Sequence, residues 1–212
     1  MSPLSILILG FLLGLKHATD TDHVVAVTAI VSRQKHLRHA AVIGAMWGIG
    51  HTAMIVLVGI AIIIFHLSIP DAAQRGFELL VAAALVVLGV LNLTGIHAHV
   101  HHHDDTAVRL LRPLVMGVIH GLAGSAAIAL LILGSITDER LALMYLGIFG
   151  VGTIIGMMLI TTLLGAPIIH GGKKFERFSA TVTLLSGILS IVYGVYFGIT
   201  IISAGQSASS SD

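Results

Sequence analysis

The sequence contains no cysteine, few charged residues and few aromatic residues. The absence of cysteine excludes disulfides, thiolate metal ligands and thiol catalysis. Only 10% of the 212 residues are charged, whereas a soluble domain has about a quarter. The formal net charge of +1 gives no indication of nucleic-acid binding, so no nucleic-acid partner is expected. The lipid bilayer is therefore the expected surrounding of most of the chain.

Hydrophobic residues are abundant and lie in continuous runs. They make up 56% of the chain, and the mean hydropathy is +1.02. A helical span needs about 20 apolar residues, and continuous runs exclude the alternating pattern of a membrane barrel. The sequence predicts an all-α polytopic membrane protein with six transmembrane helices, at about 4–31, 41–65, 77–96, 113–136, 141–169 and 179–203. The N-terminal run lacks a basic region before it and is taken as the first span.

The two halves of the chain resemble each other. The segment from Gly14 to His17 matches the one from Gly117 to His120, and residues 44–54 align with residues 147–157. We therefore expect one transmembrane domain over residues 1–204, with repeat one at about 4–96, a His-rich loop at 97–112 and repeat two at about 113–203. Residues 205–212 are expected to form a disordered tail. Three spans per repeat make the repeats inverted, which places a substrate site near the midplane.

Basic residues are unevenly distributed between the expected loops. The second and fourth loops carry only Arg75 and Arg140, and the other three carry Arg33, Lys35, Arg38, Arg109, Arg112, Lys173, Lys174 and Arg177. Lys and Arg concentrate in cytoplasmic loops. We therefore expect an inner (cell) membrane protein with both termini outside and the His-rich loop in the cytoplasm.

The first span contains four polar residues with metal-binding side chains: His17, Asp20, Asp22 and His23. Ionisable groups inside a membrane usually mark a site or a pathway, and imidazole with carboxylate suits divalent transition metals. On a regular helix His17 and Asp20 share a face, but Asp22 points elsewhere. Gathering the motif needs local unwinding or partners from other helices. The alternative is an interhelical hydrogen-bond network without a ligand, in which Lys16 pairs with Asp20.

Further histidines are candidate metal ligands. His51 lies inside the second span, and His120 occupies the position in the fourth span that His17 has in the first. Trp47 is expected to be a packing residue. A possible loop metal site consists of His97, His99, His101, His102 and His103, and the alternative is a flexible, solvated loop that happens to be rich in histidine.

The stretch from His17 to His23 is similar to the His-x4-Asp-His signature of the NiCoT nickel/cobalt transporters. Gly50-His51-Thr52 resembles the Gly-His-Ser/Thr motif of their next helix. The resemblance implies transport of Ni²⁺ or Co²⁺, with His17, Asp22 and His23 essential and His51 a further site residue. Family members usually have eight spans, so this chain resembles a short, divergent relative.

The expected function is transport of a divalent metal ion, with Ni²⁺ or Co²⁺ as substrate and no cofactor. No nucleotide-binding loop of the Gly-x4-Gly-Lys-Ser/Thr type is present, so an ion gradient, the membrane potential or a partner must supply energy. An intramembrane metalloenzyme would need a set such as His-Glu-x-x-His, which is absent. A non-transporting accessory subunit of an uptake complex is the alternative. The sequence leaves open whether the protein forms a homo-oligomer or binds a partner in an uptake complex.

Overall fold

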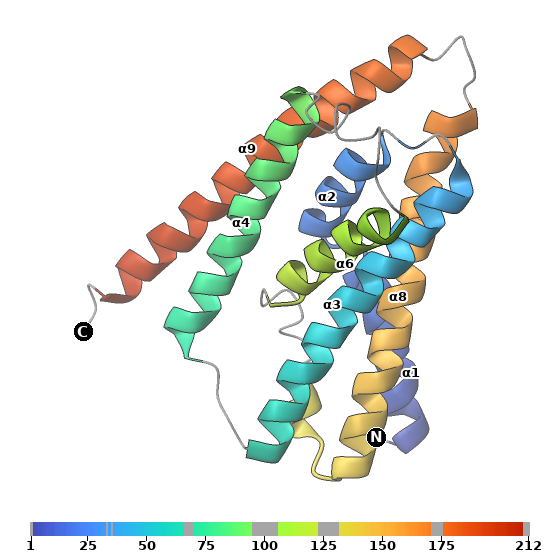
Figure 1. Cartoon of the computed structure of the whole chain (residues 1–212). Helices are drawn as coiled ribbons and strands as arrows, with labels where there is room; N and C mark the ends of the chain where they lie inside the picture. The colour runs from blue at the N-terminus through green and yellow to red at the C-terminus, as the bar shows by residue number, and fades with distance from the viewer. Residues whose placement is uncertain are drawn as a thin grey trace.

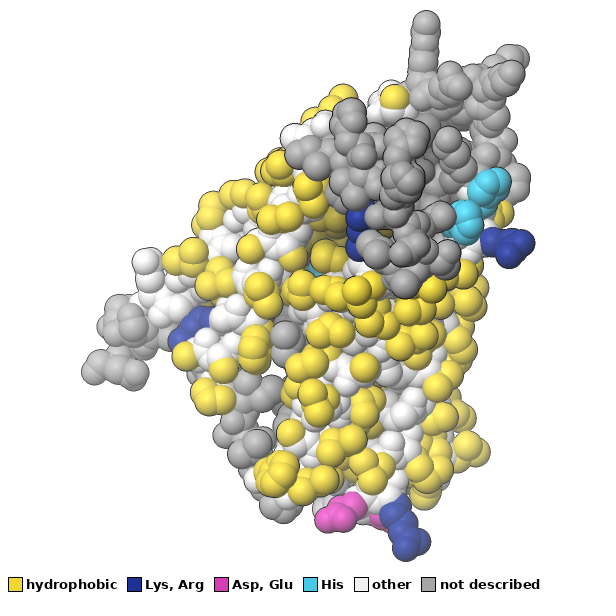
Figure 2. Space-filling view, viewed as in Figure 1, with side chains coloured by type: hydrophobic (Ala, Val, Ile, Leu, Met, Phe, Trp, Pro, Cys, Tyr) yellow, Lys and Arg dark blue, Asp and Glu magenta, His cyan; other side chains and the backbone are white. Residues whose placement is uncertain are grey.

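The computed structural model describes residues 2–32, 34, 36–65, 70–94, 106–122, 132–170 and 176–209, and we confine the description to them. Within these ranges the regular structure is entirely helical, as the composition predicts. Figure 1 shows the helices α1 (Pro3–His17), α2 (Thr21–Val31), α3 (Leu37–Phe65), α4 (Asp71–Thr94), α6 (Thr106–Leu122), α8 (Glu139–His170) and α9 (Glu176–Ser209). Apolar side chains cover most of the face seen in Figure 2, as expected of a surface in contact with lipid.

Four helices are long and apolar enough to cross a membrane, namely α3, α4, α8 and α9, with spans at Leu37–Phe65, Ala72–Thr94, Glu139–Pro167 and Ala180–Gln206. The pair α1 and α2 passes the same test together, with a bend of 52° between them, which makes up to five spans. The fourth expected span, at 113–136, includes residues 123–131 outside the described ranges. Its first part lies in the short apolar helix Leu110–Gly121. The six-span count therefore stays a prediction.

Two expected boundaries differ from the structure. Helix α6 begins at Thr106, inside the segment expected to be a loop, and α9 continues to Ser209, beyond the expected start of the tail. The helix extends into the expected tail because Ser and Ala continue a helix at modest cost. The histidines from His97 to His103 lie outside the described residues, so their proposed metal-binding role stays a prediction.

Glycines set the distance between the inner helices. A Cβ on Gly14 of α1 would come 2.8 Å from the backbone nitrogen of Thr153 in α8. Likewise, a Cβ on Gly117 of α6 would come 2.9 Å from the backbone nitrogen of His51 in α3. Small residues at such contacts let transmembrane helices pack backbone to backbone. The helices that carry the site residues are therefore held at short, fixed separations.

The register of these contacts gives the helix directions. Along α1, Gly10 meets Tyr145 and Gly14 meets Thr153, so α1 and α8 run parallel. Between α3 and α8, Gly48 meets Ile154 whereas Gly59 meets Leu146, so these two helices run antiparallel. The chain enters α6 from the end where α3 begins (Figure 1). As a result, α1 and α6 approach the centre of the molecule from opposite ends.

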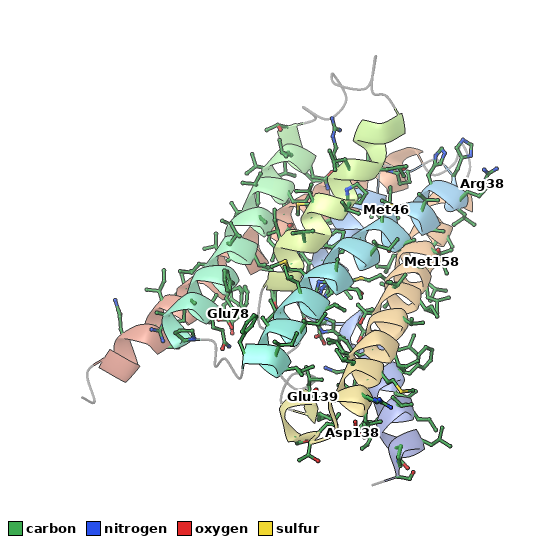
Figure 3. All side chains as sticks on the ribbon, turned by 60° about the horizontal axis from the view of Figure 1, so that its bottom comes forward. Arg38, Met46, Glu78, Asp138, Glu139 and Met158 are labelled. Atoms are coloured by element: carbon green, nitrogen blue, oxygen red, sulfur yellow. The ribbon has the colours of Figure 1, made fainter. Side chains whose placement is uncertain are left out.

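Helices α4 and α9 form a separate pair beside the group of α1, α3, α6 and α8. Helix α2 lies between the pair and this group (Figure 1). Polar contacts join the pair. The Ser190 hydroxyl donates to the Leu85 carbonyl at 2.7 Å, and the Asn92 amide nitrogen donates to the Ser186 hydroxyl at 3.1 Å. Figure 3 shows Arg38 at one end of the molecule and Asp138 and Glu139 at the other. Charged groups thus mark the two ends of an apolar bundle.

Candidate metal centre

The first span is broken next to its histidine. Helix α1 ends at His17, and the Thr19 and Asp20 N–H groups donate to the carbonyls of Lys16 and His17 at 2.8 and 3.1 Å. Asp20 is extended, with ψ of 147°, and α2 begins at Thr21. Thr and Asp favour such breaks because their side chains compete for backbone hydrogen bonds. The local unwinding considered from the sequence is therefore present.

The break brings two histidines of the motif together. Six residues along an unbroken helix would separate His17 and His23 by roughly 9 Å of axial rise and turn them to different faces. Here their ring centroids lie 4.9 Å apart. His51 from α3 adds a third ring, at 4.9 Å from His17 and 4.8 Å from His23. The site is therefore assembled both by local unwinding of the chain and by a residue from another helix, the two possibilities that the sequence left open.

These three residues form what we call the histidine cluster: His17, His23 and His51. One ligating atom from each lies within 4.8 Å of the others, and all three side chains are buried. The Nε2 atoms of His17 and His51 are 2.7 Å apart. Among the described residues, this is the group of three or more His, Cys, Asp or Glu side chains compact enough for one metal ion. Late first-row divalent metals accept such imidazole ligands.

Asp20 fixes the orientation of His17. Its Oδ2 lies 2.9 Å from His17 Nδ1, and its Oδ1 lies 3.0 Å from Lys16 Nζ, the ion pair that the sequence suggested. An ionised carboxylate only accepts, so Nδ1 of His17 carries the proton and Nε2 keeps its lone pair. That lone pair faces His51. Carboxylate–histidine pairs of this kind orient metal ligands in proteins.

Several imidazole nitrogens have no hydrogen-bond partner among the described residues. They are both ring nitrogens of His23 and Nδ1 of His51. A buried polar atom without a partner costs about 1–3 kcal/mol, which argues against a closed hydrogen-bond network as the reason for this cluster. Because a neutral imidazole has one lone pair, a bound cation would use one ring nitrogen of His23 and Nδ1 of His51.

Asp22 lies beside the histidine cluster rather than within it. Its Oδ1 is 3.5 Å from Nδ1 of His23, within ion-pair range but too long for a strong hydrogen bond. Asp22 occupies the first turn of α2, where the helix dipole favours negative charge. It therefore contributes charge close to the cluster, whereas Asp20 contributes a direct hydrogen bond.

His120 of α6 adjoins the cluster from the other side. Its ring centroid lies 5.7 Å from that of His23 and 5.0 Å from that of Trp47, and its side chain is fully buried. Nδ1 of His120 is 3.1 Å from the Met116 carbonyl. The structure thus gathers all six predicted intramembrane residues, with Asp20 and Asp22 adjoining the cluster and His120 next to His23.

Three contacting residues were not predicted as site residues. Trp47 covers His120, and Phe149 lies 5.7 Å from His17. Tyr193 of α9 lies close to Thr21, at the start of α2. Trp47 precedes His51 by four residues and so shares its helix face, a signal that was available in the sequence. Phe149 and Tyr193 come from distant segments, and no local pattern identifies them.

The fold and the buried imidazoles define a multi-pass membrane protein with a candidate site for a divalent metal. The chain is 37% identical to urease accessory protein UreH of Bacillus sp. TB-90 over 92% of this chain and 90% of that protein. It is 26% identical to a protein of Methanocaldococcus jannaschii named putative nickel/cobalt efflux system, over 89% of this chain and 90% of that protein. The chain belongs to the NiCoT-type nickel/cobalt transporter family.

A more distant relative is the chloroplast protein FOR GROWTH AND FERTILITY 1 of Arabidopsis thaliana. It is 24% identical over 88% of this chain and 56% of that protein. No protein-family model matches the sequence. No solved structure matches the chain either. The names of these relatives agree with nickel and cobalt transport across a membrane, and the efflux-system relative supports a metal ion as substrate.

Proposed function

We propose that the protein carries Ni²⁺ or Co²⁺ across the membrane and that His17, His23 and His51 bind the ion. The observation that carries the proposal is the histidine cluster itself, in which three buried side chains present ligating atoms within 4.8 Å of one another. Imidazole ligands discriminate against Ca²⁺ and Mg²⁺, which prefer oxygen. Asp20 and Asp22 supply negative charge near the ion, and His120 adjoins the site.

Matched helix contacts support an inverted repeat and alternating access. Gly50 of α3 packs against the backbones of Leu114 and Val118 in α6. Gly152 of α8 packs in the same way against Phe11 and Leu15 of α1, the residues that correspond to Leu114 and Val118 in the repeat, although Gly152 itself lies one residue before the position aligned with Gly50. A pseudo-two-fold axis that exchanges α1 with α6 and α3 with α8 accounts for both. The ion would then be exposed alternately to each side as one unit rocks against the other.

The C-terminal end of α1 favours a cation at the cluster. His17 is the last residue of α1, and the aligned carbonyls at a helix C-terminus carry partial negative charge. Binding requires the lone pairs of neutral imidazoles, so protons compete with the metal. Figure 3 shows Arg38 at the end that we propose to be cytoplasmic, where the sequence places most of the Lys and Arg residues of the short loops.

Flux into proteoliposomes tests the proposal. Purified protein in vesicles that contain a metal-sensing dye is expected to admit Ni²⁺ or Co²⁺ well above protein-free vesicles. The variant His51→Ala is expected to lose this flux because it removes a cluster ligand. The matched control is His39→Ala, which replaces an exposed histidine of the same helix and should leave flux unchanged. Equal flux in wild type and His51→Ala would place the ion elsewhere.

An accessory role is the second candidate, and the relative named urease accessory protein favours it. In that case the protein would bind the metal for a larger complex rather than move it alone. Wild-type protein that binds Ni²⁺ tightly but produces no flux in vesicles would support this alternative. Copurification of an obligatory partner from native membranes would then be the next measurement.

Replacing Asp20 by asparagine is expected to weaken Ni²⁺ binding by roughly 10- to 100-fold. Mutating the residue that orients a metal-binding histidine typically lowers metal affinity by this factor. The amide loses the negative charge that holds the proton on Nδ1 of His17. Titration calorimetry in detergent measures the change. Asp138→Asn is the matched control, since Asp138 caps the start of α8 at the far end of the molecule and asparagine caps equally well. Unchanged affinity in Asp20→Asn would contradict the orienting role.

A further inference from the structure

His120 lies one step beyond the histidine cluster. It is a direct neighbour of His23, with 5.7 Å between the ring centroids, but it does not belong to the compact group of His17, His23 and His51. Its side chain is fully buried, so its ring faces protein rather than lipid or water. A fully buried imidazole next to a metal site requires a structural reason or a role in handling the ion.

The hydrogen bond to Met116 leaves one ring nitrogen of His120 free. A carbonyl oxygen only accepts, so Nδ1 of His120 carries the proton at 3.1 Å from the Met116 oxygen. Nε2 must then have a lone pair. It has no hydrogen-bond partner among the described residues, although it is buried. His120 is therefore held in the tautomer that can bind a cation, with its ligating atom unused.

Helix α6 holds His120 in place. A Cβ on Gly121 would come 2.6 Å from the His51 carbonyl and 2.8 Å from the Cβ of Met54, so α6 lies directly against α3 on both sides of His120. Trp47 packs against the imidazole at 5.0 Å between ring centroids. His120 has little room to swing toward His17, and an ion would have to come to it.

His23 is a neighbour of both the histidine cluster and His120. Its ring lies 4.9 Å from His17, 4.8 Å from His51 and 5.7 Å from His120, and neither of its nitrogens has a hydrogen-bond partner in the described part of the chain. His17 ends a helix that enters from one end of the molecule, and His120 lies near the end of a helix that enters from the other. His23 thus stands between ligands supplied from opposite directions.

We propose that His120 is a second binding position for the ion, which leaves the histidine cluster by exchanging His17 and His51 for His120 while His23 remains bound. This inference rests on the proposed transport function and deepens it. It assigns His17 to the position reached from one side of the membrane and His120 to the position reached from the other. Removing His120 should then slow passage without weakening the resting site.

The test compares His120→Asn with His120→Gln. Asparagine keeps a donor near the place of Nδ1, and with it the bond to Met116, but has no atom at the place of Nε2. Glutamine reaches that place with an amide oxygen that can bind a metal. For His120→Asn we expect wild-type Co²⁺ affinity, an unchanged Co²⁺ visible absorption spectrum and Co²⁺ flux lower by about tenfold or more, a factor of ten being about 1.4 kcal/mol. His120→Gln should recover part of the flux.

Two results would overturn the second position. A Co²⁺ spectrum and affinity altered in His120→Asn as strongly as in His51→Ala would make His120 a ligand of the cluster itself. Wild-type flux in His120→Asn would remove it from the path. The wild-type protein separates failure of this inference from failure of the proposed function. Wild-type flux no greater than in protein-free vesicles would reject the proposed function and this inference together. Thermal unfolding of both variants identifies any loss caused by misfolding, and His120→Gln at wild-type stability with no recovered flux also counts against the proposal.

Discussion

Replacing His17 and His23 together by alanine is expected to weaken Ni²⁺ binding by at least about a hundredfold, or about 2.7 kcal/mol. The double variant removes two of the three ligands in the histidine cluster and leaves His51 as its one remaining member. A single buried imidazole cannot replace the water that the ion must give up. Titration calorimetry of purified protein in detergent gives the affinity, and vesicle flux should fall to the level of protein-free vesicles.

The matched control also removes two histidines. His36 and His39 are exposed near the start of α3, with ring centroids 5.3 Å apart, so His36→Ala/His39→Ala alters the total histidine content by the same amount. Its Ni²⁺ affinity and flux should match those of the wild type. Comparable losses in the two double variants would mean that surface histidines, and not the buried cluster, determine the measured binding.

Replacing Gly117 by alanine is expected to lower the free energy of unfolding by about 1–3 kcal/mol, the usual cost of forcing a methyl group into a packed contact. The new Cβ would overlap the Trp47 carbonyl and come 2.9 Å from the His51 nitrogen. Backbone atoms cannot turn aside as a side chain can, so α6 must move away from α3. This displacement separates His120 from His23, and flux should fall with stability.

Gly147 of α8 provides the control, because a Cβ there has no atom within 4 Å among the described residues. Alanine at this position should raise stability by about 0.4–1 kcal/mol, since it restricts the unfolded chain and fits a helix. The two substitutions are chemically identical and should shift the unfolding midpoint in opposite directions, as measured by thermal unfolding in the same detergent. A shift of equal sign and size would show that the α3–α6 contact tolerates separation.

The sequence predicted the chemistry of the site better than its geometry. The polar run from His17 to His23 predicted a membrane site, and the spacing of Lys16, His17 and Asp20 predicted that their side chains lie together. Their contacts are present, although Asp20 lies outside the helix. The motif also indicated that a regular helix would not easily gather His17, Asp22 and His23. What the sequence left open was whether the chain unwinds or recruits other helices, because this depends on packing against α3 and α8.

Other features could not be read from local pattern. The contact of His51 with His17 depends on the register between α3 and α1, which is set through α8 by glycines far apart in the sequence. The free Nε2 of His120 depends on a carbonyl one turn earlier in its own helix. Hydropathy does not reveal that a helix such as α6 is short or that α1 bends into α2, since a broken apolar run scores like an intact one.

The reciprocal glycine contacts of α3 with α6 and of α8 with α1 also concern the origin of the chain. Under the proposed repeat, an ancestral protein of half this length would have inserted in both orientations and assembled as an antiparallel pair. Duplication and fusion then freed each half to diverge. The first half keeps Asp20, Asp22 and His23, whereas the aligned positions of the second half are Ala123, Ser125 and Ala126. A symmetric ancestor would have had two equivalent sets of ligands, and under this proposal the loss of one set would have left a single asymmetric path.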